Sequence, residues 1–382
     1  MIRLIKNCHC ISPDVDLIGA SIELEGAFIK KIYKKGDHVP DIDSVYDAHG
    51  NMAMPGFIDI HCHGCGGFDV ADGSARAIEN IAKGKVKEGV TTFAPTTLSL
   101  PYERLETIMA AVSAYKKDER YAKIAGVHCE GPFINRDYLG AQNPAYQRKP
   151  DMEEVRKLNK ITRISIITCA PEIEGGLTFI SELRAEGIVP SCGHSAATYA
   201  QFRKAREAGL RQLTHFCNQM TGLHHREIGL VGAGLLDDDL FVEIICDRIH
   251  LCPEMVALIF KVKPIEKIML ITDSIAASGL DDGMYTIGGL DISIENKISR
   301  LVKNPDVLAG SVVPFNRAVK NAYEISGLPL KQLVKTTGFN QAQAIGLDKT
   351  GRLEPGYYAD ITILNDEFSP IMVFVNGEAA EL

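Results

Sequence analysis

The sequence lacks long hydrophobic runs and dense clusters of basic residues. No apolar stretch approaches the roughly 18 residues that a membrane-spanning helix needs. The N-terminal residues carry neither a long apolar segment nor a cleavage site of small residues, so we expect a first strand there and no signal peptide. The formal net charge of −8 and the absence of a Lys/Arg cluster argue against a nucleic-acid surface. These absences predict a cytoplasmic protein that binds neither membranes nor nucleic acids.

Cysteine is too sparse to define the fold. Ten cysteines in 382 residues are too few for a disulfide scaffold. The segments Cys8–Cys10 and Cys62–Cys65 have spacings that metal ligands can use, but no second paired block lies at the distance of a zinc ribbon. Most other cysteines lie in apolar runs, where a free thiol behaves as a small hydrophobic side chain. We therefore expect the cysteines to have structural or incidental roles.

The middle of the chain, residues 53–345, alternates short apolar runs with segments of helical periodicity. Near-continuous hydrophobic strands that alternate with helices are typical of a parallel (β/α)₈ barrel. A doubly wound open sheet is the alternative, but no Gly-x-Gly-x-x-Gly follows an early strand. The predicted strands are 57–61, 90–96, 124–128, 164–170, 188–193, 211–215, 241–246 and 267–273. Predicted helices include Ser74–Lys87, Tyr102–Lys117, Thr178–Glu186 and Tyr199–Ala208.

Both ends of the chain show a different pattern, in which short segments of alternating polar and apolar residues are separated by turns. Residues 1–52 show this pattern, and residues 346–382 show it again after the turn Gly351–Gly356. Neither end holds enough strands to be stable by itself in water. We therefore expect one small β-sandwich domain, built from residues 1–52 and 346–382, with the barrel of residues 53–345 inserted between its two parts.

Histidines and acids concentrate at the predicted strand ends, where (β/α)₈ barrels carry their function. His61 and His63 point to the same side of an extended chain because they are two residues apart. Ordinary half-buried histidines are the alternative, but more than half of the eleven histidines lie at or near such ends. This clustering predicts a metal site. Its candidate residues are His61, His63, Glu130, His194, His215 and Asp273.

Imidazole and carboxylate ligands without clustered thiolates suit zinc, iron(II), manganese or cobalt in an open catalytic site. Six candidates exceed the needs of one four-coordinate ion. Either two ions share Glu130, or one ion leaves some residues free for substrate and proton transfer. A bound metal lowers the pKa of water to about 7. Asp273 would then take the proton and pass it to the leaving group, so we expect hydrolysis of an amide or related C–N bond.

Several motifs extend this pattern and carry a resemblance. The sequence resembles the amidohydrolase superfamily and, within it, the N-acetylglucosamine-6-phosphate deacetylases, over essentially its whole length. The motifs are Pro55–Gly64, His128–Phe133, Ala170–Glu172, Gly193–Ser195, Thr214–Met220, Arg226–Glu227, Thr272–Asp273 and Leu308–Ser311.

The resemblance implies metal-dependent deacetylation of N-acetylglucosamine 6-phosphate, and it implies roles for individual residues. Glu130, His194 and His215 match the core metal ligands of the family. His61 and His63 match the pair that can hold a second ion, and Asp273 matches the catalytic acid/base. The sugar phosphate is expected to contact Asn218, Gln219, Arg226 and His250, and Ala309 lies near the acetyl end. Arg226 is expected to reach the active site of a neighbouring subunit, which implies a homodimer.

The sequence departs from the family pattern without losing a candidate metal ligand. Gln142 stands where the family often has His; its amide still offers a donor to a sugar hydroxyl or carbonyl, so we expect it to bind substrate. Ile228 and Arg248 are further departures near the expected sugar site. These changes leave N-acetylgalactosamine 6-phosphate open as an alternative substrate. A barrel without activity that serves as a binding protein is a second alternative, disfavoured because all six metal-site candidates are present.

Overall fold

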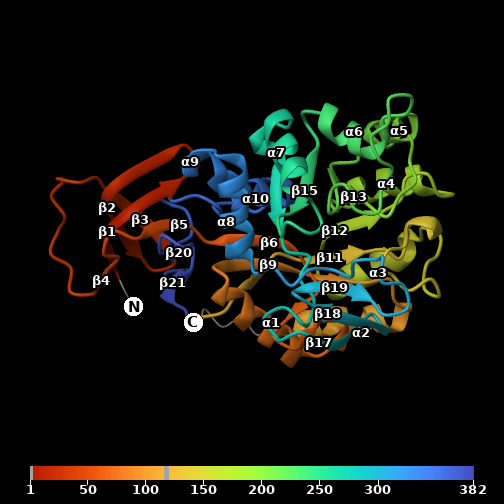
Figure 1. Cartoon of the computed structure of the whole chain (residues 1–382). Coiled ribbons are helices and arrows are strands. Elements are labelled where there is room, and N and C mark those ends of the chain that lie inside the picture. Colours follow the sequence, from red (N-terminus) through yellow and green to blue (C-terminus); the bar gives the residue numbers. More distant parts are fainter. Residues whose placement is uncertain (1–2, 116–119) are drawn as a thin grey trace.

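The computed structural model describes residues 3–115 and 120–382. Figure 1 shows a larger body of helices and strands, with a smaller sheet at its left side in which N-terminal strands and C-terminal strands lie together. The two ends of the chain thus meet in one sheet, as the strand-and-turn pattern shared by both termini predicts.

Eight parallel strands form the core of the larger body. They follow one another around the sheet in chain order, and each is hydrogen-bonded to the next. Between the last and the first, closure consists of a bridge between Cys62 and Ser274 and of hydrogen bonds that include Asp273 N to His61 O at 2.9 Å and His63 N to Ser274 O at 2.8 Å. The predicted (β/α)₈ barrel is confirmed, in a nearly closed form. Its strands are β6 (Phe57–Cys62), β9 (Val90–Thr97), β11 (Val127–Glu130), β12 (Ile164–Cys169), β13 (Val189–Cys192), β14 (Gln212–Leu213), β15 (Phe241–Ile245) and β16 (Ile268–Ile271).

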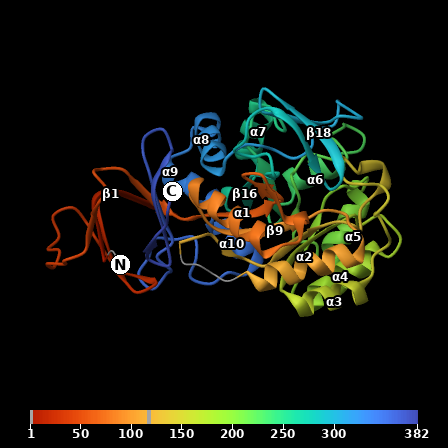
Figure 2. The same cartoon turned by 90° about the horizontal axis from the view of Figure 1, so that it is seen from below.

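Helices surround these strands, as the view from below shows (Figure 2). Helix α5 begins and ends at the predicted residues, because Thr198 and Gln201 form a capping box and Gly209 adopts a left-handed conformation after its last turn. The predicted end of one helix, Lys117, lies outside the described residues. Within the described ranges, no helix is long and apolar enough to cross a membrane. The helices are α1 (Ala75–Lys87), α2 (Tyr102–Ala114), α3 (Met152–Ile161), α4 (Gly176–Ala185), α5 (Tyr199–Ala208), α6 (Gly229–Leu236), α7 (Pro253–Val262), α8 (Phe315–Ser326), α9 (Leu330–Leu333) and α10 (Phe339–Ile345).

The smaller body is one mixed sheet of eight strands. Its edge strand β3 returns to the C-terminal segment, where Ile29 N donates to Tyr357 O over 2.9 Å. The sheet thereby folds over an apolar core of its own that includes Ile22, Ile361 and Phe374. The exact domain limits at 52/53 and 345/346 stay a prediction. The strands are β1 (Leu4–Ser12), β2 (Val15–Glu25), β3 (Phe28–Tyr33), β4 (Val45–Asp47), β5 (Met52–Pro55), β20 (Ile361–Leu364), β21 (Pro370–Val375) and β22 (Glu378–Ala379).

Two features of the barrel differ from the sequence-based expectation. The strand expected at 124–128 is divided into β10 (Lys123–Ile124) and β11, because Gly126 between them adopts a positive φ of 101°. A three-stranded antiparallel sheet, β17 (Gly283–Ile287), β18 (Leu290–Glu295) and β19 (Ile298–Leu301), follows β16 and was not expected. A smaller hairpin, β7 (Gly64–Cys65) and β8 (Phe68–Asp69), follows β6.

A buried ionic cluster joins α1 to both strands at the incomplete closure of the barrel. The Nζ atom of Lys85, which is 0% exposed, lies 2.9 Å from Asp59 Oδ2 and 2.6 Å from Glu88 Oε2. Asp59, on β6, also accepts hydrogen bonds from the main-chain N–H and the hydroxyl of Thr272, at 3.2 and 2.5 Å. The carboxylate of Asp59 therefore links β6 to the end of β16 where the ladder of hydrogen bonds is missing.

Replacing Lys85 by methionine should strongly destabilise the fold. The substitution leaves Asp59 and Glu88 buried without their cation, and loss of one partner of a buried ion pair costs about 3–5 kcal/mol. Urea unfolding followed by circular dichroism measures this loss. Lys83→Met is the matched control, because Lys83 lies on the same helix but forms an exposed pair with Glu79 that should contribute little. Equal effects of both variants would show that the buried cluster does not stabilise the barrel.

Candidate metal centre

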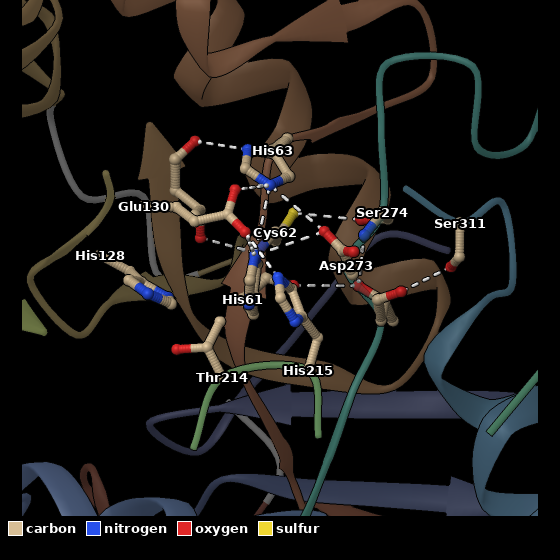
Figure 3. Close-up of polar contacts among 12 residues, drawn as sticks. His61, Cys62, His63, His128, Glu130, Thr214, His215, Asp273, Ser274 and Ser311 are labelled. Atoms are coloured by element: carbon tan, nitrogen blue, oxygen red, sulfur yellow. Dashed lines mark hydrogen bonds and ion pairs between the residues drawn. The ribbon is translucent and has the colours of Figure 1, made fainter. Parts of the chain in front are cut away.

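Six side chains from five strands converge at the carboxyl ends of the barrel strands. Figure 3 shows His61, His63, Glu130, His215 and Asp273 among them, with Asp273 facing the two histidines at the end of β6. All six candidates are buried, and Asp273 is the most exposed of them at 7%. The sequence-based expectation that these residues lie together in space agrees with the structure. They are His61, His63, Glu130, His194, His215 and Asp273.

The candidates form two groups that could each hold a cation, with Glu130 between them. Glu130 Oε1 lies 3.0 Å from the Nε2 atoms of both His194 and His215, which are 3.1 Å apart. In the second group, Asp273 Oδ1 lies 3.3 Å from His61 Nε2 and 3.2 Å from His63 Nε2. Glu130 Oε2 is 3.3 Å from His63 Nε2, so the carboxylate reaches both groups.

Main-chain carbonyl groups fix which ring nitrogen of two histidines faces the cluster. His63 Nδ1 lies 3.1 Å from Thr96 O, and His194 Nδ1 lies 2.7 Å from Tyr138 O. Since a carbonyl oxygen only accepts, each Nδ1 donates, and each Nε2 is left facing the other members of the cluster, where it takes up either a proton or a metal ion. Several lone pairs and carboxylate oxygens facing one another repel unless a cation lies among them. The residues therefore fit a divalent metal ion.

Glu243, a fully buried acid on β15, supports this arrangement and was missed by the sequence analysis. Its Oε2 lies 3.1 Å from His61 Nδ1 and accepts a hydrogen bond from the main-chain N–H of His215, also at 3.1 Å. Gln212 donates to its other oxygen at 3.0 Å. The signal in the sequence was a single acid inside the apolar run 241–246. Glu243 thus orients candidates from two different strands.

His128 lies beside this cluster without joining it. Together with His61 and Glu243 it forms a third group whose ligand atoms lie close together. Both of its nitrogens are already engaged, Nδ1 with Ile60 O at 3.0 Å and Nε2 with Thr168 Oγ1 at 2.7 Å. Burial and the neighbouring His61 lower the pKa of His128 well below its usual value. His128 is therefore a neutral side chain that packs under the cluster.

The electrostatics of the cluster favour added positive charge. Burial raises the pKa of Asp273, but the charges of His61 and His63 outweigh this effect and lower it to about 2. Burial likewise opposes a charge on His61, yet Asp273 and Glu243 raise its pKa to about 9. The pKa of His63 is also raised, against burial, by Asp273 and Glu130. The carboxylates thus remain ionised at neutral pH and attract protons or metal ions to the histidines.

Three of the candidates lie just beyond their strands in a strained backbone conformation. His194, His215 and Asp273 have positive φ angles of 49°, 31° and 50°. Such angles are unfavourable for residues with a side chain and persist where the surroundings enforce them. For Asp273 the main chain is held on both sides, by its N–H to His61 O and by Ser311 N–H to its own carbonyl at 2.8 Å. These angles turn the side chains from the strand direction towards the cluster.

A cavity of about 250 Å³ opens above the cluster. Gln142, Asn218, Gln219 and His250 line it, as expected for substrate-binding residues, although their contact with substrate stays a prediction. The sequence analysis missed the lining residues Ile287, Asp306 and Val307 because it did not identify the β17–β19 sheet and the segment after it. It also missed Leu98, which lies just after β9.

Two expected substrate residues lie outside this cavity. Ala309 is fully buried and does not line it, whereas its neighbours Leu308 and Gly310 do. Arg226 is exposed in a separate surface depression, where its Nη1 atom lies 2.7 Å from His225 Nε2. No lysine or arginine appears among the described residues that line the cavity. Within one chain, therefore, the structure does not bring Arg226 to the cluster.

The apparent affinity for a divalent metal should rise with pH, because protons and metal compete for the same nitrogen atoms. A pKa of about 9 means that His61 is protonated below this pH in the metal-free protein and loses the proton above it. We therefore expect Zn²⁺ binding to strengthen from about pH 6 to about pH 9 and to release protons. Calorimetry in two buffers of different ionisation enthalpy measures both effects. A pH-independent affinity without proton release would contradict this assignment of charges.

Comparisons with known proteins agree on the family to which this chain is similar. The model of the amidohydrolase family matches residues 52–380. N-acetylglucosamine-6-phosphate deacetylase of Lysinibacillus sphaericus is 34% identical over 334 residues, covering 86% of this chain and 85% of the relative. N-acetylgalactosamine-6-phosphate deacetylase of Escherichia coli O157:H7 is 33% identical over 344 residues, covering 88% and 90%.

Two solved structures extend the similarity to the fold. N-acetylglucosamine-6-phosphate deacetylase from Thermotoga maritima superposes with a TM-score of 0.89 at 35% identity, covering 98% of this chain and 99% of that one. A mutant of the Mycobacterium smegmatis enzyme, in complex with N-acetyl-D-glucosamine-6-phosphate, gives a TM-score of 0.91 at 27% identity, covering 99% and 98%. The chain therefore belongs to the amidohydrolase family, within the group of the N-acetylglucosamine-6-phosphate deacetylases and their relatives.

Proposed function

We propose that this protein hydrolyses N-acetylglucosamine 6-phosphate to glucosamine 6-phosphate and acetate with the help of a bound divalent metal. The observation that carries the proposal is the convergence of Glu130, His194 and His215 beneath the cavity, with His61, His63 and Asp273 alongside. The nearly full-length similarity to enzymes with this activity supports it.

In this proposal Glu130, His194 and His215 would hold one ion. His61, His63 and Asp273 would hold a second where it is present, and Glu130 lies within reach of both groups. Zinc, iron, manganese and cobalt all suit these nitrogen and oxygen ligands. The bound metal would supply an activated water and polarise the acetyl carbonyl.

Asp273 is the proposed acid/base. Its lowered pKa of about 2 keeps it ionised at neutral pH, so it is ready to accept a proton from the attacking water. Its side chain lines the cavity, where the substrate amide would lie. Asp273 then gives that proton to the amide nitrogen as the C–N bond breaks, which leaves the amino sugar and acetate. The contact of Asp273 with His61 and His63 holds the carboxylate in place for both transfers.

The sugar is proposed to bind through the polar side chains that line the cavity. Asn218 and Gln219 offer amide donors and acceptors that suit sugar hydroxyl groups, whereas Gln142 lies beside them with both ends of its amide engaged by Ser99 and Glu130. His250 lies at 2.6 Å from Asp247, and although burial opposes a charge on it, this contact raises its pKa and favours the cationic form that a phosphate attracts. We place the acetyl end near Ala309, through its neighbours Leu308 and Gly310.

The phosphate needs more positive charge than the described lining residues of one chain provide. A guanidinium group binds a phosphate through two parallel hydrogen bonds. We propose that the exposed Arg226 supplies this group to the cavity of a second subunit, so that the active enzyme is a homodimer. The exposure of Arg226 and its position outside its own cavity support this arrangement.

An acetate-release assay on purified protein tests the proposed activity. The substrates are N-acetylglucosamine 6-phosphate and N-acetylgalactosamine 6-phosphate, each with and without chelator. The similarity to the Escherichia coli O157:H7 deacetylase makes the second sugar the alternative substrate. Metal-dependent acetate release from the glucosamine derivative supports the proposal. If neither sugar releases acetate, the proposed activity is refuted and only a binding role for the barrel remains.

Asp273→Asn should lower kcat by about 10²–10⁴-fold, because the amide cannot take up the proton of the water. Bound metal should largely remain, since Glu130, His194 and His215 are unchanged. Steady-state kinetics and elemental analysis measure the two effects. Asp366→Asn, at an exposed site remote in sequence, is the control and should behave as the wild type. Near-normal turnover of Asp273→Asn would make the assignment of the acid/base wrong.

Arg226→Ala should raise KM for the phosphorylated sugar by about tenfold or more, because charged hydrogen bonds to the phosphate are lost. KM for unphosphorylated N-acetylglucosamine should change little. The control is Arg76→Ala, which removes another exposed arginine, on α1. Equal effects of Arg226→Ala on KM for both substrates would show that Arg226 does not bind the phosphate.

A mixture of two impaired variants would show which subunit supplies the arginine. In a mixed dimer of Arg226→Ala and Asp273→Asn subunits, the site with an intact Asp273 receives Arg226 from its partner. Random mixing should therefore restore about a quarter of the wild-type activity at limiting substrate. No recovery after exchange of subunits would show that Arg226 acts within its own chain.

A further inference from the structure

The side chain of Gln142 contacts the carboxylate that joins the two groups of the metal centre. Its Nε2 atom donates to Glu130 Oε2 over 2.6 Å, and its Oε1 atom accepts from the main-chain N–H of Ser99 over 2.7 Å. The side chain is only 4% exposed. Both ends of this amide are thus engaged by the protein itself.

These two contacts fix the orientation of the amide. The N–H of Ser99 only donates, so it selects the oxygen of Gln142 and leaves the NH₂ group facing Glu130. The other carboxylate oxygen, Glu130 Oε1, faces the Nε2 atoms of His194 and His215, both at 3.0 Å. The Gln142 donor therefore holds one oxygen of the carboxylate while the other is directed at the histidines.

The loop that carries Gln142 also holds a second member of the centre. Tyr138 O accepts the hydrogen bond of His194 Nδ1 at 2.7 Å, and Gln142 N donates to Leu139 O at 2.9 Å to close the turn between them. One short segment, residues 138–142, thus orients both Glu130 and His194. Outer contacts of this kind to metal ligands typically change metal affinity by about 10–100-fold when they are lost.

We propose that Gln142 is a positioning residue that acts on the metal centre through Glu130, more than a residue that binds substrate. The inference rests on the proposed metal-dependent function and deepens it. A neutral amide holds Glu130 without cancelling its negative charge, so the full charge of the carboxylate remains available to the metal. Gln142 stands where the family often has His, and here its amide turns towards the metal-site carboxylate.

The test measures zinc affinity in the absence of substrate, where a substrate-binding residue has no effect. Gln142→Leu keeps the approximate volume of the side chain and removes both polar groups. On the full-length protein, freed of metal, competition with a chromophoric chelator should show a Kd for Zn²⁺ raised by about 10–100-fold. In the same variant, kcat should fall at subsaturating zinc while KM for N-acetylglucosamine 6-phosphate stays within about twofold.

Gln219→Leu is the matched control. It removes the same functional group from another glutamine that lines the cavity, and it should raise KM while leaving zinc affinity unchanged. Gln142→His, whose ring retains an N–H donor, should recover part of the lost affinity, and circular dichroism verifies the folding of each variant. Should Gln142→Leu not fold, the Kd of Gln142→His against that of Gln142→Ala decides the same question.

The outcomes separate this inference from the proposed function. If Gln142→Leu binds zinc as tightly as the wild type and only KM rises, Gln142 binds substrate and the inference is wrong. If zinc affinity depends on Gln142 but the wild type releases no acetate from either sugar phosphate, the proposed function fails and the positioning role stands. A wild-type protein without affinity for zinc, manganese, iron(II) or cobalt would overturn both.

Discussion

The structure depends on one electrostatic constraint, which is that several electron-pair donors lie within hydrogen-bond distance of one another in a buried site. His194 and His215 direct Nε2 atoms at the same oxygen of Glu130, and His61 and His63 do the same towards Asp273. Burial strengthens the mutual repulsion because little water screens it. Added positive charge makes the arrangement stable. The raised pKa of His61 and the lowered pKa of Asp273 have the same electrostatic cause.

The barrel maintains this arrangement from beneath. Glu243 holds His61, and carbonyl oxygens hold His63 and His194, so that few ring rotations remain open. At the closure between β6 and β16, which bears His61 and Asp273, the ladder of hydrogen bonds is incomplete. At this point the buried ion pairs of Lys85 with Asp59 and Glu88 stabilise the barrel, because Asp59 also accepts hydrogen bonds from Thr272.

The parts of the fold and site that were predictable are those with a local signal. Strand β12 is buried along its whole length and is rich in isoleucine, and His61-x-His63 fixes two side chains on one face by spacing alone. Strands β17 and β18 lacked this signal because only three of their eleven residues are buried. The amide of Gln142 is oriented by Ser99, 43 residues away, and such a distant contact leaves no pattern along the chain. No pattern along the chain shows that Arg226 lies outside its own cavity, and only the family resemblance led us to expect it to reach a neighbouring subunit.

Charge balance connects the metal centre with the binding of a phosphorylated sugar. The cavity carries the carboxylates of Glu130 and Asp273, with Asp306 at its exposed rim, and none of its described lining residues is a lysine or arginine. In the proposed function, one divalent ion would cancel the charges of Glu130 and Asp273, whereas a second ion would leave an excess of positive charge that attracts the phosphate over several ångströms. An arginine from a second subunit would therefore matter most when a single ion is bound. The proposed number of ions and the proposed contribution of Arg226 are thus two parts of one electrostatic problem, because both would add positive charge to a cavity whose described lining holds no lysine or arginine.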